Sequence, residues 1–260
     1  MGNGKKSDGA KSLHNTGFVA AGRLIGNFCL DLLYPRRCPV CDEIVVPTGK
    51  IICKKCLDRL VPVQGPRCFR CSKPLMKAED EFCYDCGGKP HSYNRGIAVF
   101  SYGSVLAKSL YQLKYHNRKE YGVFYGKYAA RYAEKQIRKW GIEALIPVPI
   151  HPKRLAKRGY NQAQVIAQEM GKCLCLPVET GAVKRIHNTK PQKELGASER
   201  RKNLEKAFVP GKKKMVWKRV LVVDDIYTTG STIDAVSKVL KKSGVEEVYF
   251  LTIAIGNGQN

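Results

Sequence analysis

Residues 220–232 read Val-Leu-Val-Val-Asp-Asp-Ile-Tyr-Thr-Thr-Gly-Ser-Thr and carry the clearest structural signal in the chain. The apolar run 220–223 is typical of a strand buried in a parallel sheet. Two adjacent carboxylates, Asp224 and Asp225, follow it, and then come a hydroxyl-rich turn with one glycine and a helical pattern. Backbone N–H groups at a helix N-terminus, together with Thr and Ser hydroxyls, bind phosphate well. The stretch therefore predicts a phosphate-binding loop over residues 228–232.

The acidic pair indicates which kind of phosphate ligand this loop would bind. Two carboxylates beside a phosphate would repel it unless they bind sugar hydroxyls or magnesium. A simpler interpretation is that Ser231 or Thr232 only caps the following helix. Capping accounts for one hydroxyl, but not for the acidic pair together with the Thr-Thr-Gly-Ser-Thr run, so ligand binding is the favoured interpretation.

Outward from this stretch, strand and helix patterns alternate along the C-terminal two thirds of the chain. Apolar runs predict strands over residues 96–100, 144–149, 220–223 and 248–253. Helical spacing predicts helices over residues 106–113, 121–140, 162–173 and 232–243. This order gives βαβ units, so the predicted fold is α/β, with a mostly parallel sheet flanked by helices.

The N-terminal third contains Cys-x-x-Cys four times, at an unbroken period of 15 residues. The eight cysteines are Cys38, Cys41, Cys53, Cys56, Cys68, Cys71, Cys83 and Cys86. Two such pairs complete a tetrahedral Cys₄ zinc site, so about two zinc ions are expected. The spacing allows both a sequential and a cross-braced pairing of the knuckles. Disulfides are the alternative, but no clear export signal accompanies the repeat.

The zinc is expected to be structural rather than catalytic. Residues 38–90 hold few large aliphatic side chains, so metal must supply much of the folding free energy. With cysteine as every ligand, no coordination position stays open for a substrate. Cys29, Cys173 and Cys175 fall outside the repeat and are expected in the core.

The chain is strongly basic, with 46 Lys and Arg against 22 Asp and Glu and a net charge of +24. Residues 91–260 carry +18 of this, whereas residues 38–90 are nearly neutral. An anionic ligand is therefore expected for the C-terminal part, and a zinc-dependent transcription factor is disfavoured. The best candidate for a membrane span, residues 17–33, is interrupted by polar residues and predicts an amphipathic helix behind a basic tail. A cytoplasmic protein is expected.

Residues 222–232 resemble the 5-phosphoribosyl-1-pyrophosphate (PRPP) signature of type I phosphoribosyltransferases. The wider chain, from about residue 32 to 255, resembles the ComF family of competence-associated proteins, which join zinc knuckles to such a domain. Further matching pieces are residues 145–149, residues 151–162, and the spacing of Thr189, Gln192, Leu195, Arg200 and Asn203. Together with the basic tail and helix (residues 1–37), the resemblance divides the rest of the chain into a double zinc-knuckle module (residues 38–90) and a phosphoribosyltransferase-like domain (residues 91–260).

The resemblance also implies a role for each matching residue. Asp224 and Asp225 would hold the 2′ and 3′ hydroxyls of the ribose, with magnesium accompanying PRPP. The 5′-phosphate would be held by Thr228, Thr229, Gly230, Ser231 and Thr232. Arg154 and Arg158 lie near the family's pyrophosphate-binding loop. Residues 185–203 correspond to a mobile loop, whose Lys190 and Arg200 join the two aspartates as catalytic candidates.

The implied reaction is displacement of magnesium-bound pyrophosphate from ribose C1 by a nucleophile, usually nitrogen. It requires stabilisation of the leaving group's charge and exclusion of water, not a protein nucleophile. The acceptor is not fixed by the sequence. The family points to DNA uptake in natural transformation. The alternative is a non-catalytic accessory that binds single-stranded DNA, with competence proteins as partners and the domain serving as a scaffold or PRPP sensor.

Residues 91–140 are a candidate hood over the acceptor. Aromatic residues interleave there with basic ones, a pattern that stacks bases in single-strand binders. The simpler interpretation is an amphipathic helix pair whose tyrosines pack on the sheet. The aromatic residues are Tyr102, Tyr111, Tyr115, Tyr121, Phe124, Tyr125 and Tyr128.

Overall fold

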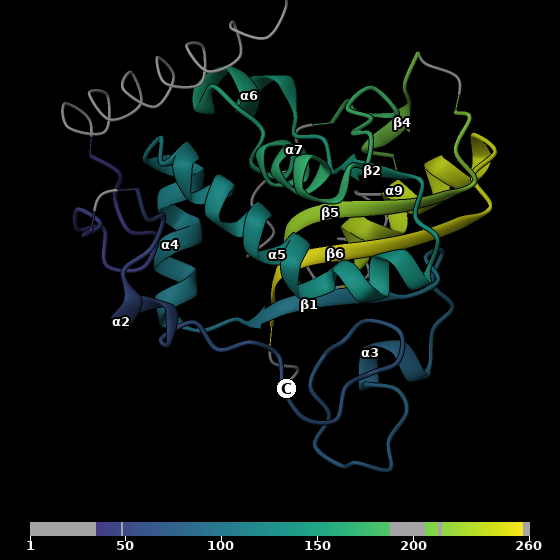
Figure 1. Ribbon diagram of the computed structural model, residues 1–260. Helices are drawn as coiled ribbons and strands as arrows, with labels where there is room; N and C mark the ends of the chain where they lie inside the picture. Colours follow the sequence, from purple (N-terminus) through teal and green to yellow (C-terminus); the bar gives the residue numbers. More distant parts are fainter. Residues whose placement is uncertain (1–34, 48, 188–205, 213–214, 257–260) are drawn as a thin grey trace, which may run out of the picture.

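The computed structural model describes residues 35–47, 49–187, 206–212 and 215–256 (Figure 1). Its centre is a four-stranded sheet in the order β1-β6-β5-β2, in which every neighbouring pair is parallel. The strands are β1 (Gly96–Ser101), β2 (Ala144–Pro147), β5 (Arg219–Tyr227) and β6 (Glu247–Ile255). The predicted α/β fold with a parallel sheet is confirmed.

Helices cover both faces of this sheet, with α5 and α7 on one side and α9 on the other (Figure 1). Helices α4 (Ser104–Tyr115) and α5 (Lys119–Lys139) follow β1, α6 (Pro152–Arg158) and α7 (Gln162–Leu174) follow β2, and α9 (Ser231–Lys242) joins β5 to β6. Strands β3 (Val183–Arg185) and β4 (Phe208–Pro210) form a small antiparallel pair beside α9. The single turns α2 (Lys54–Leu57) and α3 (Tyr84–Gly87) lie in the cysteine repeat.

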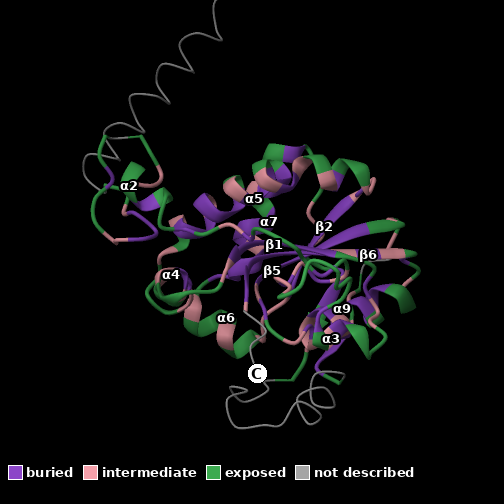
Figure 2. Cartoon of the chain, turned by 90° about the horizontal axis from the view of Figure 1, so that it is seen from below, coloured by how far each residue is buried: buried purple, intermediate pink, exposed green. Residues whose placement is uncertain are grey.

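The apolar run of β5 is continuous because both faces of the strand are buried (Figure 2). Leu221 and Val223 pack in the cluster that contains α5 and α7, whereas Val220 and Val222 pack in the cluster that contains α9. Successive side chains of a strand point to opposite faces. Asp224 therefore continues the α9 side of the strand, and Asp225 continues the α7 side.

The cysteine repeat forms two modules that dock at different places on the sheet domain. We name residues 35–60 the first cysteine module and residues 65–90 the second. Cys38 and Cys56 of the first share a hydrophobic cluster with Tyr121 of α5, whereas the second module's cysteines share one with Val236 of α9. Accordingly, α2 lies beside α4, while α3 lies far from α2, on the α9 side (Figures 1 and 2).

The structure departs from the sequence-based expectations in several places. Strand β5 continues through both aspartates to Tyr227, and α6 was not predicted. The expectation of core positions for Cys173 and Cys175 is wrong: both are exposed, at the end of α7, where Cys175 adopts a left-handed conformation (φ 56°) that terminates the helix. The predicted helix within residues 17–33 lies outside the described residues.

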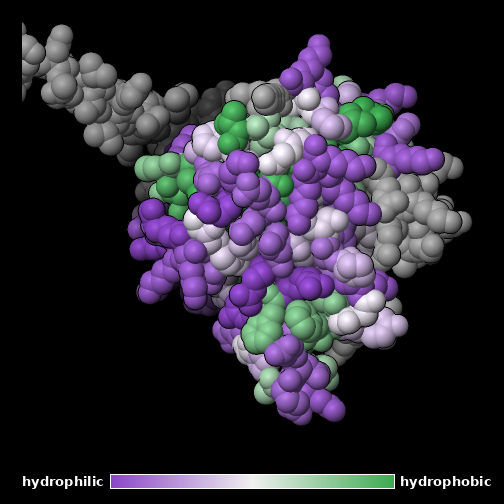
Figure 3. Space-filling model, turned by 90° about the vertical axis from the view of Figure 1, so that its right-hand side faces the viewer, coloured by the Kyte–Doolittle hydropathy of each residue, from purple (hydrophilic) through white to green (hydrophobic). Residues whose placement is uncertain are grey.

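The surface agrees with the composition. The face shown in Figure 3 is mainly hydrophilic, with a few separate hydrophobic areas. Among the described residues, no helix is both long and apolar enough to span a bilayer.

Candidate functional site

The predicted phosphate loop is the turn between β5 and α9. Gly230 ends it with φ 77°, and a Cβ at this position would lie 2.5 Å from Tyr227 Oη, so only glycine fits. Thr229 Oγ1 and Ser231 Oγ share a hydrogen bond of 2.9 Å. The capping interpretation is wrong, because Gly230 is the cap residue and no side chain caps α9. The first backbone N–H groups of α9 are therefore not occupied by a capping side chain and can attract an anion.

The acidic pair is buried at the carboxyl end of β5. Asp225 is 4% exposed, and its Oδ1 accepts a 2.9 Å hydrogen bond from Gln162 Nε2 at the start of α7. Its Oδ2 forms an ion pair with Lys114 Nζ near the end of α4. The Asp225 backbone N–H donates to Asp224 Oδ1 at 2.8 Å. The strand thus holds the Asp225 carboxylate against a cation and an amide from two different helices, while the Asp224 carboxyl group accepts from the backbone of the same strand.

Burial affects the two carboxyl groups differently. Burial and the neighbouring Asp225 charge raise the pKa of Asp224 well above its usual range. Burial would also raise the pKa of Asp225, but the Lys114 ion pair and the Gln162 hydrogen bond outweigh it and hold that pKa below its usual range. Asp225 therefore ionises first as the pH rises, and Asp224 is protonated more readily than Asp225.

A cationic cavity of about 420 Å³ opens beside Asp225. It is lined by Lys114, Tyr115, Asn117, Arg154, Lys157 and Arg158, of which four are cations. Arg158 Nη1 donates to Gln162 Oε1, and its guanidinium lies 5.5 Å from the centre of the Tyr115 ring. Gln162 therefore connects Arg158 to Asp225, and the cavity is suited to an anion held next to the acidic pair.

A further arginine is near enough to Asp224 to interact with its charge. The pKa of Arg185, in β3, is lowered by burial and by the nearby charge of Arg154, while Asp224 opposes this shift. Basic side chains thus lie on both sides of the acidic pair. A larger cavity of about 560 Å³ lies between the second cysteine module and α5, at the start of β1. That position is remote from the carboxyl ends of the strands, where parallel α/β sheets bind their ligands.

The structure brings together part of the predicted site. The aspartates, the loop residues 228–232, Arg154 and Arg158 lie at the carboxyl ends of β2 and β5. Lys190 and Arg200 lie outside the described residues. Sequence reasoning missed Lys114 and Gln162, which are 111 and 63 positions from Asp225 in the chain. No local pattern marks such distant partners.

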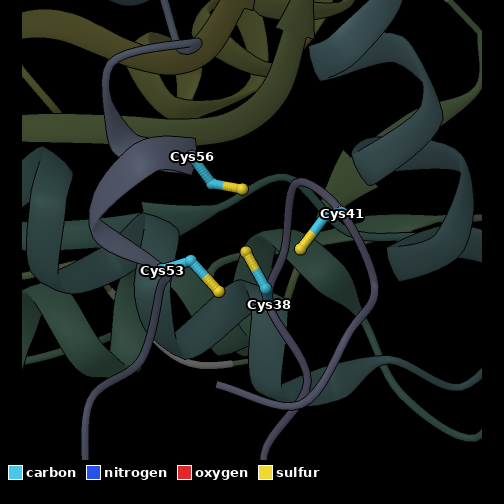
Figure 4. Close-up of side chains that lie close together, drawn as sticks. All are labelled: Cys38, Cys41, Cys53 and Cys56. Atoms are coloured by element: carbon cyan, nitrogen blue, oxygen red, sulfur yellow. The ribbon is translucent and has the colours of Figure 1, made fainter. Parts of the chain in front are cut away.

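The eight repeat cysteines form two clusters of four. Cys38, Cys41, Cys53 and Cys56 form one, with their sulfur atoms directed toward one another (Figure 4), and Cys68, Cys71, Cys83 and Cys86 form the other. Within each cluster the sulfur atoms lie within 4.8 Å of one another. The pairing of knuckles is therefore sequential, and the cross-braced alternative is wrong.

The sulfur geometry fits metal ligands better than disulfides. Cys71 Sγ and Cys83 Sγ are 3.6 Å apart. A disulfide requires about 2.05 Å, whereas ligands about 2.3 Å from a tetrahedral zinc lie roughly 3.8 Å from one another. Both clusters are closed Cys₄ sets of the kind that hold structural zinc.

Comparison with known families agrees with both halves of this description. Residues 29–87 match the double zinc ribbon domain, and residues 155–259 match the phosphoribosyl transferase domain. Fold and site thus define a zinc-ribbon protein with a phosphoribosyltransferase domain. Competence protein F of Haemophilus influenzae is 34% identical over 175 residues, which cover 65% of this chain and 76% of that protein. The chain belongs to the ComF family.

Other relatives are more distant. The DNA utilization protein YhgH of Escherichia coli K12 is 28% identical over 174 residues, covering 64% of this chain and 74% of that protein. Competence protein ComFC of Streptococcus pneumoniae is 26% identical over 151 residues, covering 58% of this chain and 64% of that protein.

Proposed function

We propose that this protein binds PRPP with Mg²⁺ at the carboxyl ends of β2 and β5 and transfers its phosphoribosyl group to an acceptor. The observation that carries the proposal is the buried acidic pair, Asp224 and Asp225, set between a glycine-ended loop and a cationic cavity. These three parts match the three polar parts of PRPP: the ribose hydroxyls, the 5′-phosphate and the pyrophosphate.

Each part of the ligand is assigned to residues of this chain. The two aspartates accept hydrogen bonds from the 2′ and 3′ hydroxyls. Residues 228–232 and the N-terminus of α9 bind the 5′-phosphate. Lys114, Arg154 and Arg158 face the pyrophosphate. The donor set fits Mg²⁺, because this hard cation is usually held by one or two carboxylates together with substrate phosphates. Bound there, magnesium would neutralise part of the charge of the leaving group.

The residues around the cavity also fit the demands of the reaction. Departure of pyrophosphate leaves positive charge on the ribose, while negative charge develops on the leaving group. Fixed cations at the cavity stabilise that negative charge more strongly in the transition state than in the ground state. Burial of the aspartates keeps their hydrogen bonds to the sugar away from competing water.

The relatives suggest the process that this activity serves. One is named a competence protein and another a DNA utilization protein. We therefore place the proposed phosphoribosyl transfer in support of DNA uptake, with nucleobases and DNA ends as the acceptors to screen first.

The Asp225→Asn variant tests the PRPP proposal by isothermal titration calorimetry with and without Mg²⁺. Zinc-replete wild-type protein is expected to bind PRPP in a magnesium-dependent way, and the variant to bind at least roughly tenfold more weakly, because a charged hydrogen-bond acceptor is lost. Glu246→Gln, which removes an exposed acid of the same domain, should bind as the wild type does. Thr229→Val tests the loop separately, should Asp225→Asn fail to fold. Absence of PRPP binding by the folded wild type would refute the proposal.

Single-stranded DNA is a second candidate ligand, favoured by one surface feature. Tyr111 and Tyr115 on α4 are 55% and 62% exposed, and their rings lie 4.8 Å apart. Tyr102 is also exposed, whereas Tyr121, Phe124 and Tyr125 are buried and Tyr128 is partly buried. The buried aromatic residues pack as the simpler interpretation of the hood predicts, so only the exposed tyrosines remain available for stacking.

A salt titration tests DNA binding. Affinity for a single-stranded oligonucleotide is expected to fall steeply as ionic strength rises. Tyr111→Ala should weaken binding about fivefold or more if a base stacks there. Tyr84→Ala, which truncates a 92% exposed tyrosine of the second cysteine module, is the matched control. Equal affinities of both variants and the wild type would exclude this surface.

A further inference from the structure

A three-residue linker, His91-Ser92-Tyr93, contacts the chain on both sides of the phosphate loop. The linker lies between the last cysteine of the repeat and β1. Before the loop, Tyr93 Oη and Tyr227 Oη share a buried hydrogen bond of 2.7 Å. After the loop, Asp234 in the first turn of α9 accepts bonds from His91 Nδ1 at 2.6 Å and from the Ser92 backbone N–H at 2.8 Å. Both ends of the loop are therefore fixed by consecutive residues of one segment.

Aromatic packing makes the contact before the loop rigid. Tyr93 is 3% exposed and stacks on His91, with ring centres 4.8 Å apart. Tyr93 and Phe250 pack edge to face with ring centres 4.9 Å apart, and Phe250 stacks on Tyr227 with ring centres 5.0 Å apart. Tyr227 Oη lies under Gly230, close enough to exclude a Cβ there. Tyr93 therefore holds the Tyr227 phenol, and Gly230 of the loop packs against that same phenol.

The other side of the linker joins the second cysteine module. His91 Nε2 lies 3.3 Å from the carbonyl oxygen of Asp85, which stands between Cys83 and Cys86. The Asp85 carboxylate forms a 2.6 Å ion pair with Lys73, which is only 5% exposed. A continuous set of contacts thus runs from the second cysteine cluster to the first turn of α9.

The first cysteine module makes a comparable contact elsewhere. Its Asp42 accepts a hydrogen bond from Tyr121 and pairs with Arg118 Nε at 3.3 Å, at the junction of α4 and α5. These contacts involve the α4–α5 junction rather than residues 227–234. The two modules resemble each other in sequence but differ in what they support.

We propose that His91 and Tyr93 are positioning residues for the phosphate loop, and that the second cysteine module acts through them to hold the loop in its ligand-binding conformation. The reason is that backbone N–H groups bind phosphate well only when they already point at one place, because ordering them on binding costs affinity. The ligand in this inference rests on the proposed PRPP function, whereas the ordering of the loop does not.

The experiment measures amide hydrogen exchange over residues 226–236 in the zinc-loaded full chain. Tyr93→Phe removes one oxygen atom and Asp234→Asn weakens the contact on the other side of the loop. Each is expected to speed exchange of the loop amides about fivefold, the equivalent of one hydrogen bond. Affinity for ribose 5-phosphate should fall by a similar factor, while affinity for inorganic pyrophosphate, which the cationic cavity would bind, should not change. Asp42→Asn is the matched control and should leave the loop unchanged.

A second pair of variants tests the role of the second cysteine module. Cys86→Ser and Cys56→Ser alter buried cysteines at equivalent positions of the two modules. Only Cys86→Ser should speed exchange in the loop. Unchanged exchange in Tyr93→Phe and Asp234→Asn, or an equal increase in Asp42→Asn, would overturn the inference. Faster exchange in a protein whose wild type binds neither PRPP nor ribose 5-phosphate would leave the positioning role standing and refute the proposed function instead.

Discussion

Replacing Lys114 by Met is expected to lower the free energy of unfolding by about 3 kcal/mol at pH 7.5, because the change leaves a buried carboxylate without its cation. The Asp225 side chain is 6% exposed and that of Lys114 is 21% exposed, so water compensates only partly for the lost charge. Met keeps the aliphatic length of the side chain, which confines the change to the ammonium group. The loss should therefore report the electrostatics of the acidic pair rather than packing.

The deficit is expected to shrink as the pH falls. The pKa of Asp225 is depressed in the wild type, so the stability that the ion pair contributes is present above the unfolded-state pKa of about 4 and is lost as pH falls through the lower folded-state value. In the variant, burial without Lys114 should raise the pKa of Asp225, as it already raises that of Asp224. The variant then gains relative stability on acidification as the folded state takes up protons.

Urea unfolding of both proteins at several pH values between 8 and 5 measures this difference, and comparison at equal pH cancels effects shared by the two chains. Lys108 lies on the same helix but is exposed, so Lys108→Met should lower the free energy of unfolding by less than about 0.5 kcal/mol at every pH. A Lys114→Met deficit that stays constant with pH would mean that the lysine stabilises the fold by packing alone.

Ion pairs between residues far apart in the chain, such as Lys114 and Asp225, could not be predicted from the sequence. The β5 strand, the acidic pair and Gly230 could be predicted because they lie in one short stretch, where strand burial, loop chemistry and helix start follow one another. Lys114 could not, because its role depends on the end of α4 reaching the end of β5 across the fold. In the sequence it is one of 46 basic residues, most of which serve as surface charges.

The cysteine repeat shows the same limit in another form. Equal spacing of 15 residues identifies the ligands but gives no reason to prefer one pairing of knuckles. What decides the pairing is tertiary: the first module docks through Asp42 on α4 and α5, and the second docks through the linker on α9. Two separate docking places favour two self-contained modules, because a cross-braced pairing would have to bring all four knuckles together.

Removal of zinc is expected to unfold both cysteine modules while the sheet domain stays folded. Among the described residues between 35 and 90, the buried apolar side chains other than cysteine are only Pro39, Val40, Val45, Leu60 and Val63. A core this small contributes a few kcal/mol, whereas binding of one structural zinc contributes about 10 kcal/mol or more. Limited proteolysis after chelation should therefore cut within residues 35–90 and spare a fragment containing β1 to β6. Protection of both modules in metal-free protein would contradict this.

Zinc counting in two quadruple variants tests the sequential pairing, because each variant removes two complete knuckles. Changing Cys38, Cys41, Cys53 and Cys56 to Ala removes one cluster and should leave one zinc per chain, since the other cluster keeps all four ligands. Changing Cys38, Cys41, Cys68 and Cys71 to Ala leaves two thiols in each cluster and should leave no tightly bound zinc. A cross-braced protein would give the opposite result for each variant. The two variants lose the same number of cysteines, so the difference in bound metal reports pairing alone.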